Sequence, residues 1–147
     1  IEDSLVSTTG ALAGIAIGAG SKSVILMTAL VIIAVESTSM GASEFLSEET
    51  EEEIEEEKMP ASPKVSGLLV FGSYVLAGLI PLLPYLLLPH ITAIPFSIAF
   101  ALIGMIILGI VKGKVTKKST LRSAGEVLII GGIATAIGVV VGLIFKV

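Results

Sequence analysis

Three residues in one apolar segment have side chains that can bind cations or carry protons. Glu36, Met40 and Glu44 recur at intervals of four residues, so they lie along one stripe of a helix. A carboxylate inside a membrane-spanning helix is energetically costly and commonly marks an ion or proton pathway. The thioether of Met40 is a soft ligand that suits transition metals, whereas Mg²⁺ and Ca²⁺ do not require one. This stripe therefore predicts a path for a transition-metal cation through a membrane.

A dense acidic run follows the stripe directly. It includes Glu48, Glu49 and Glu52, which are further candidate cation ligands, and it extends to Glu57. Such a run is typical of a solvated, self-repelling linker. Alternatively, its carboxylates form a funnel that raises the local concentration of divalent cations at a pore entrance. Carboxylates alone discriminate poorly between metals, so we assign selection to the stripe and not to the run.

The composition and the lengths of the apolar segments predict an all-α integral membrane protein. The chain has 147 residues, is 54% hydrophobic and has a mean hydropathy of +1.01. Five segments are each long enough to cross a bilayer core as a helix, at about 4–20, 24–46, 65–88, 92–111 and 121–145. Strands of a barrel would instead be about ten residues of alternating polarity. We expect one transmembrane domain over residues 1–147, with an acidic linker at 47–64.

The basic residues between these segments predict the orientation in the membrane. With five spans, one side holds Lys58, Lys64, Lys112, Lys114, Lys117, Lys118 and Arg122. The other side holds Lys22 and Lys146. Because loops rich in Lys and Arg stay in the cytoplasm, we expect the N-terminus and the acidic linker to be cytoplasmic and the C-terminus to lie on the far side. The pattern leaves open which membrane the protein occupies.

A tight turn at residues 20–23 predicts that the first two segments form an antiparallel hairpin. Counted from this turn, Asp3 and Met40 lie equally far along their helices, at about 28 Å for a rise of 1.5 Å per residue. The hairpin thus places a carboxylate and a thioether at one depth, with Glu36 about one turn nearer the far side. Nearby hydroxyl groups supply either oxygen ligands or hydrogen bonds between helices; they belong to Thr8, Thr9, Ser37 and Ser39.

Small residues predict close helix packing. Gly10, Gly14 and Gly18 form one small-residue stripe, and Gly138 and Gly142 form a second at the same spacing. An odd number of spans in a small chain also favours assembly into an oligomer.

Enzyme chemistry has no support in this sequence. The chain has no cysteine, which excludes disulfides and thiolate metal sites. We find no nucleophile with a neighbouring base, no phosphate-binding loop and no cofactor motif. The basic loop at 112–122 is an ordinary cytoplasmic membrane anchor rather than a nucleic-acid site. Within it, Arg122 and Glu126 are spaced to form an ion pair along a helix.

Several stretches together resemble the vacuolar iron transporter family of Fe²⁺ and Mn²⁺ transporters. They are DSLVSTTG at 3–10, SMGASEFLS at 39–47, GLIPLLPY at 78–85, LRSA at 121–124 and IIGG at 129–132. The resemblance implies a homodimer with five helices per subunit and a metal path near the two-fold interface, lined by the first two helices. It also implies that Asp3 and Met40 match the metal-path residues of the family, and that Glu44 matches the acidic residue at the inner end of the second helix.

The chain also departs from the family pattern. Plant-type members have a long cytoplasmic helical domain that binds metal through Glu and Met, whereas this chain resembles a short form with only residues 47–64 and the single Met59 there. Ser4 occupies a position that is usually Gly in the family. Glu36 lies where another pathway residue is expected, and its role is particular to this chain.

The sequence thus predicts a transporter that carries Fe²⁺ or Mn²⁺, as substrate, out of the cytosol. Exchange with protons through Asp3 or Glu36 is a hypothesis, because a carboxyl group in an apolar environment is sensitive to its surroundings. Expected partners are divalent cations, protons, the lipid bilayer and a second copy of the chain. Two alternatives stay open: a Ca²⁺ or Mg²⁺ transporter in which Met40 only packs, and a membrane scaffold that transports nothing.

Overall fold

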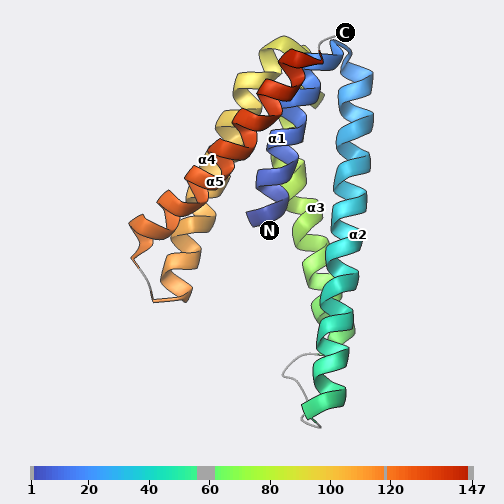
Figure 1. Cartoon of the computed structure of the whole chain (residues 1–147), viewed down its shortest axis with the longest axis vertical. Helices are drawn as coiled ribbons and strands as arrows, with labels where there is room; N and C mark the ends of the chain where they lie inside the picture. Colours follow the sequence, from blue (N-terminus) through green and yellow to red (C-terminus); the bar gives the residue numbers. More distant parts are fainter. Residues whose placement is uncertain (1, 56–61, 118, 146–147) are drawn as a thin grey trace.

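The computed structural model describes residues 2–55, 62–117 and 119–145, and it forms a bundle of five helices (Figure 1). In chain order these are α1 (Glu2–Ala19), α2 (Lys22–Glu55), α3 (Pro63–Leu87), α4 (His90–Val115) and α5 (Thr120–Ile144). The prediction of an all-α fold with five helices is confirmed. The hairpin turn between α1 and α2 is also present, where Gly20 takes a φ of 59° that residues with a side chain rarely adopt.

Four of the five helices are long and apolar enough to cross a membrane, namely α2 to α5. The expectation of five such spans is therefore met for four, and α1 is the exception. Glu2 and Asp3 stand in its first turn, and much of the rest is Gly, Ala, Ser and Thr. A helix of this composition has too little apolar surface to face lipid along its length.

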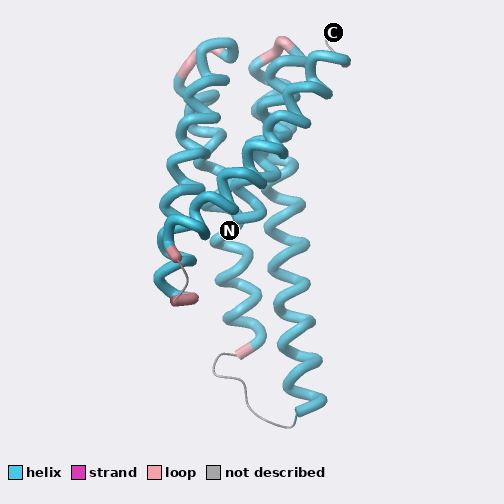
Figure 2. Tube along the Cα trace, turned by 60° about the vertical axis from the view of Figure 1, so that its left-hand side comes forward, coloured by secondary structure: helices cyan, strands magenta, loops and turns pink. Residues whose placement is uncertain are grey.

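The packing of α1 explains its composition. This helix contacts all four others, and 11 of its 18 residues are buried. Its N-terminal end lies beside the middle of α2 in both views, so α1 spans only the upper part of the bundle (Figures 1 and 2). Small side chains let the surrounding helices approach it closely, and the neighbouring helices carry the large apolar side chains that remain exposed.

The acidic run adopts a different structure from the linker that we expected. Helix α2 continues through Glu55, so the part of the run that the structure describes is helical. Glu56, Glu57 and Met59 lie outside the described residues, as do the side chains of Glu53 and Glu55. Helices α2 and α3 extend together well beyond the N-terminal end of α1 and beyond the α4–α5 hairpin (Figure 2).

Glycines allow two of the close helix crossings. A Cβ atom on Gly14 or Gly138 would collide with backbone atoms of the opposite helix, which makes the α1–α5 contact a backbone-to-backbone one. A Cβ atom on Gly41 would lie 2.9 Å from the carbonyl oxygen of Gly67, and one on Gly67 would lie 2.7 Å from that of Gly41. The second crossing joins α2 to α3 directly beside Met40.

Candidate cation site

The carboxylate of Glu36 is held by a serine of the first helix. Ser7 Oγ donates a hydrogen bond of 2.9 Å to Glu36 Oε2, and the Glu36 side chain is partly buried between α1 and α2. The bond leaves the second carboxylate oxygen of Glu36 without a partner among the described residues. A fixed carboxylate with one oxygen available is a suitable hard ligand for a divalent cation.

This hydrogen bond also confirms the helix register that the sequence predicts. Asp3 lies four residues before Ser7 on α1, and Met40 lies four residues after Glu36 on the antiparallel α2. Because the two helices are antiparallel and rise equally per residue, Asp3 and Met40 lie at the same depth. Met40 is 36% exposed in the single chain.

Asp3 lines a cavity at the N-terminal end of α1. The cavity has a volume of about 320 Å³, and its other lining residues are Glu2, Val6, Tyr74 and Ile130. Asp3 is close enough to both Glu36 and Tyr74 for its charge to act on their side chains. Two acidic residues of α1, a tyrosine of α3 and an isoleucine of α5 therefore line one cavity.

Ser4 attaches this end of α1 to α3. Its hydroxyl donates a hydrogen bond of 2.9 Å to the backbone carbonyl of Tyr74, and both residues are buried. The bond holds the backbone of Asp3 against α3. A glycine at position 4, the residue usual in the family motif, has no side chain to make this contact.

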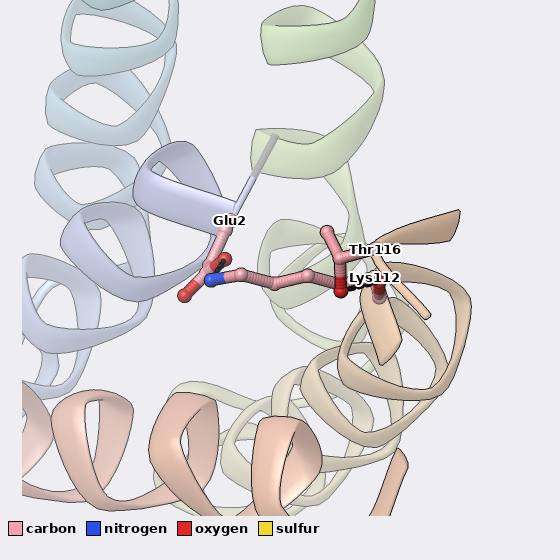
Figure 3. Close-up of polar contacts among 3 residues, drawn as sticks. All are labelled: Glu2, Lys112 and Thr116. Atoms are coloured by element: carbon pink, nitrogen blue, oxygen red, sulfur yellow. Dashed lines mark hydrogen bonds and ion pairs between the residues drawn. The ribbon is translucent and has the colours of Figure 1, made fainter. Parts of the chain in front are cut away.

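A salt bridge joins the same end of α1 to α4 (Figure 3). Lys112 Nζ lies 2.9 Å from Glu2 Oε2, and the two side chains are 46% and 33% exposed. Thr116 Oγ1 in turn donates to the carbonyl oxygen of Lys112, at 2.7 Å. Lys112 of α4 thus lies beside the cavity, although α4 contributes no lining residue.

The remaining acidic candidates lie farther along α2. Glu44, Glu48 and Glu52 are partly buried and recur at intervals of four, whereas Glu49 is exposed. One oxygen of Glu48 is buried and has no hydrogen-bond partner in the part of the chain that the structure describes. Within residues 2–55, 62–117 and 119–145, no three acidic or His side chains come close enough together to hold a metal ion.

Two of the four predicted hydroxyl groups bond within their own helices. Thr9 Oγ1 donates to the carbonyl oxygen of Leu5 at 2.5 Å, and Ser37 Oγ donates to that of Ala34 at 3.2 Å. Thr8 Oγ1 is buried and has no partner among the described residues. The predicted ion pair between Arg122 and Glu126 is present, at 3.1 Å.

Three residues at the site were not singled out from the sequence: Ser7, Tyr74 and Glu2. Ser7 could have been found, because it lies one turn from Asp3 on the same helix face. Tyr74 and Glu2 gave no such signal, since their proximity to Asp3 and Lys112 depends on how distant segments pack.

The four apolar helices that are long enough to cross a membrane define a multi-pass membrane protein. A family model confirms and narrows this class: the VIT family matches at residues 1–62 and 55–143, which is nearly the whole chain. The chain belongs to the VIT family.

Individual relatives match over a shorter stretch. Vacuolar iron transporter 1 of Arabidopsis thaliana is 44% identical over 72 residues, which are 48% of this chain and 29% of that protein. Vacuolar iron transporter of Centaurea cyanus is 38% identical over 82 residues, 55% of this chain and 34% of that protein. Vacuolar iron transporter 1 of Tulipa gesneriana is 33% identical over 82 residues, which are 55% of this chain and 33% of that protein. The matched stretch spans only about a third of each of these relatives.

Proposed function

We propose that this chain transports divalent transition-metal cations, Fe²⁺ or Mn²⁺, out of the cytosol. The observation that carries the proposal is the Ser7–Glu36 hydrogen bond, which orients a carboxylate between α1 and α2 about one helical turn from the depth of Asp3 and Met40. Two carboxylates and a thioether suit Fe²⁺ or Mn²⁺ better than Mg²⁺, which favours oxygen ligands and water. Names of the relatives support iron as one cargo.

The proposed path begins at the acidic part of α2. Glu44, Glu48, Glu49 and Glu52 concentrate divalent cations at the cytoplasmic end and pass them toward Met40 and Glu36. Because carboxylates titrate, Asp3 or Glu36 also serves as the exchange site for a counter-transported proton.

We further propose that two copies of the chain complete the site. One chain alone, over its described residues, lacks a cluster of three acidic or His ligands. A two-fold axis beside α1 and α2 would bring together Asp3, Glu36 and Met40 from both copies. An apolar groove of about 620 Å³ between α1 and α5, with Ser7 at one end, offers a surface for such an assembly.

Uptake into liposomes tests the proposed function. The purified chain is expected to move Fe²⁺ and Mn²⁺ down a concentration gradient, faster when an opposing proton gradient is imposed. Asp3→Ala and Glu36→Ala are each expected to reduce the initial rate at least about tenfold, since each removes a group that binds the cation inside the membrane.

Each alternative predicts a different result from the same assay. A scaffold would give no uptake of either metal. A Ca²⁺ or Mg²⁺ transporter would give uptake of those ions that survives Met40→Leu, whereas the proposed site loses transition-metal uptake in this variant. Normal transport by both Asp3→Ala and Glu36→Ala would leave the function standing and disprove the site.

A further inference from the structure

We propose that Lys112 is a built-in competitor for the cation: its ammonium group occupies Glu2 until an entering divalent cation displaces it. Lys112 would thereby set the affinity of the cavity at the N-terminal end of α1. This inference rests on the proposed transport function and adds an affinity-determining residue from α4, a helix outside the pathway described above.

The position of Glu2 carries the first step. Glu2 and Asp3 are adjacent residues that line the same cavity, together with Tyr74. A divalent cation that reaches Asp3 through this cavity comes within reach of the Glu2 carboxylate. Glu2 Oε2 is already occupied there, because Lys112 Nζ lies 2.9 Å away (Figure 3).

The exposure of the pair carries the second step. The Lys112 and Glu2 side chains are 46% and 33% exposed, so both remain in contact with solvent. Exposed ion pairs contribute little to stability and exchange their partners readily. A divalent cation, with twice the charge of the ammonium group, can therefore displace Lys112 from Glu2 without removing a buried charge from its partner.

The Lys112 side chain can then swing into solvent. Its backbone stays fixed, because the carbonyl oxygen of Lys112 accepts hydrogen bonds from the Thr116 hydroxyl and backbone amide. Glu2 is the one salt-bridge partner of Lys112 within the described residues, and Glu126 is also near enough for its charge to act on the ammonium group of Lys112. The long, flexible stem of lysine suits such a movement better than a packed, bidentate arginine would.

A purely structural role for the pair gives a different expectation. A salt bridge that only fastens α1 to α4 would act on folding, so the loss of either partner would lower the yield and thermal stability. Competition instead predicts opposite effects of the two partners on the apparent KM, because Glu2 attracts the cation and Lys112 blocks it.

Initial rates of Mn²⁺ uptake into liposomes, measured against Mn²⁺ concentration at constant ionic strength, test the proposal. Lys112→Gln is expected to lower the apparent KM about two- to fivefold, the range of an exposed ion pair, with little change in kcat. Glu2→Gln is expected to raise the KM. In the double variant, Lys112→Gln should add no further decrease to the KM of Glu2→Gln.

A control variant separates competition from a general change in surface charge. Lys114 is exposed on the same last turn of α4 and has no salt bridge in the described part of the chain, so Lys114→Gln removes an equal charge without freeing Glu2. Its KM should stay at the wild-type value. Lys112→Arg keeps the connection to α4 but binds a carboxylate more strongly, so it should raise the KM.

The outcomes distinguish this inference from the function on which it rests. A wild-type chain that moves neither Mn²⁺ nor Fe²⁺ would overturn both. Wild-type uptake together with equal KM values for Lys112→Gln and Lys114→Gln would overturn the competition alone. Loss of folded protein in Lys112→Gln, with a wild-type KM in Lys112→Arg, would assign the pair a structural role and also overturn it.

Discussion

Glu36 has its carboxylate oriented by a single side chain of a neighbouring helix. Its partner Ser7 supplies a neutral donor, so the carboxylate is oriented without being neutralised by a basic residue. A lysine or arginine at that position would compete with a cation for Glu36. A serine hydroxyl can give up or share its bond when a cation approaches.

Replacing Ser7 tests this role of the hydroxyl. Ser7→Ala leaves Glu36 in place but removes its donor, so we expect Mn²⁺ uptake to fall about three- to tenfold, in line with the net free energy of about 1 kcal/mol for a typical intramolecular hydrogen bond. Uptake should not be abolished, because the carboxylate remains. Initial rates in liposomes give the measurement.

Thr135→Ala provides a matched control for the loss of a hydroxyl. Among the residues that the structure describes, Thr135 Oγ1 bonds only to the carbonyl oxygen of Gly131 in its own helix, at 2.8 Å, and the variant should transport at the wild-type rate. Equal rates in Ser7→Ala and the wild type would show that Glu36 needs no donor to function.

Among the helices, α1 and α5 depend most on small residues. Gly10 and Gly14 on α1 meet Gly138 and Gly142 on α5, and added Cβ atoms at these positions would overlap the opposite backbone. The crossing sets the position of α1 in the bundle, and therefore that of Asp3 and Ser7. Packing of one helix pair thus determines the geometry of the site.

Two glycines of α5 give a direct comparison. A Cβ atom on Gly138 would collide with the carbonyl of Gly10, whereas one on Gly132 would meet no atom within 4 Å. Gly138→Ala is expected to destabilise the fold by about 1–3 kcal/mol through overpacking. Gly132→Ala should be neutral or stabilising by up to about 1 kcal/mol, because alanine favours helix more than glycine does.

Thermal unfolding in detergent measures both variants. A midpoint for Gly138→Ala equal to that of Gly132→Ala would mean that α1 and α5 can separate without cost. In that case the crossing would not hold Asp3 and Ser7 in place.

The proposed assembly of two chains makes a prediction about the bundle surface. Because the sequence contains no cysteine, a single introduced thiol reports on one contact without interference. Ala11 lines the groove between α1 and α5 and is only partly buried. If a second copy packs along α1 near the two-fold axis, Ala11→Cys should form disulfide-linked dimers on mild oxidation in the membrane.

Ile103→Cys serves as the comparison, since Ile103 is 54% exposed on α4 and lines neither the groove nor the cavity at Asp3. It should stay monomeric under the same oxidation. Efficient cross-linking through Ile103, with none through Ala11, would place the partner on a different face.

Local patterns in the sequence were enough to predict the five helices, the α1–α2 hairpin and the shared depth of Asp3 and Met40. Each depends on residues close along the chain: apolar periodicity, a turn at Gly20 and a constant rise per residue. Local patterns could not predict that α1 is the central helix, or that the acidic run continues α2. The central position of α1 depends on its burial by four other helices. The continuation of α2 depends on how far the helix extends beyond its apolar segment.

The surroundings of Asp3 were decided by packing between distant segments. Ser4 bonds to a residue 70 positions away, and Glu2 pairs with a residue 110 positions away. No spacing rule connects such residues, because their distance depends on how α1 sits against α3 and α4 together. The chain alone thus determined which groups could bind a cation, whereas the folded bundle determined which of them line one cavity and which lysine lies beside it.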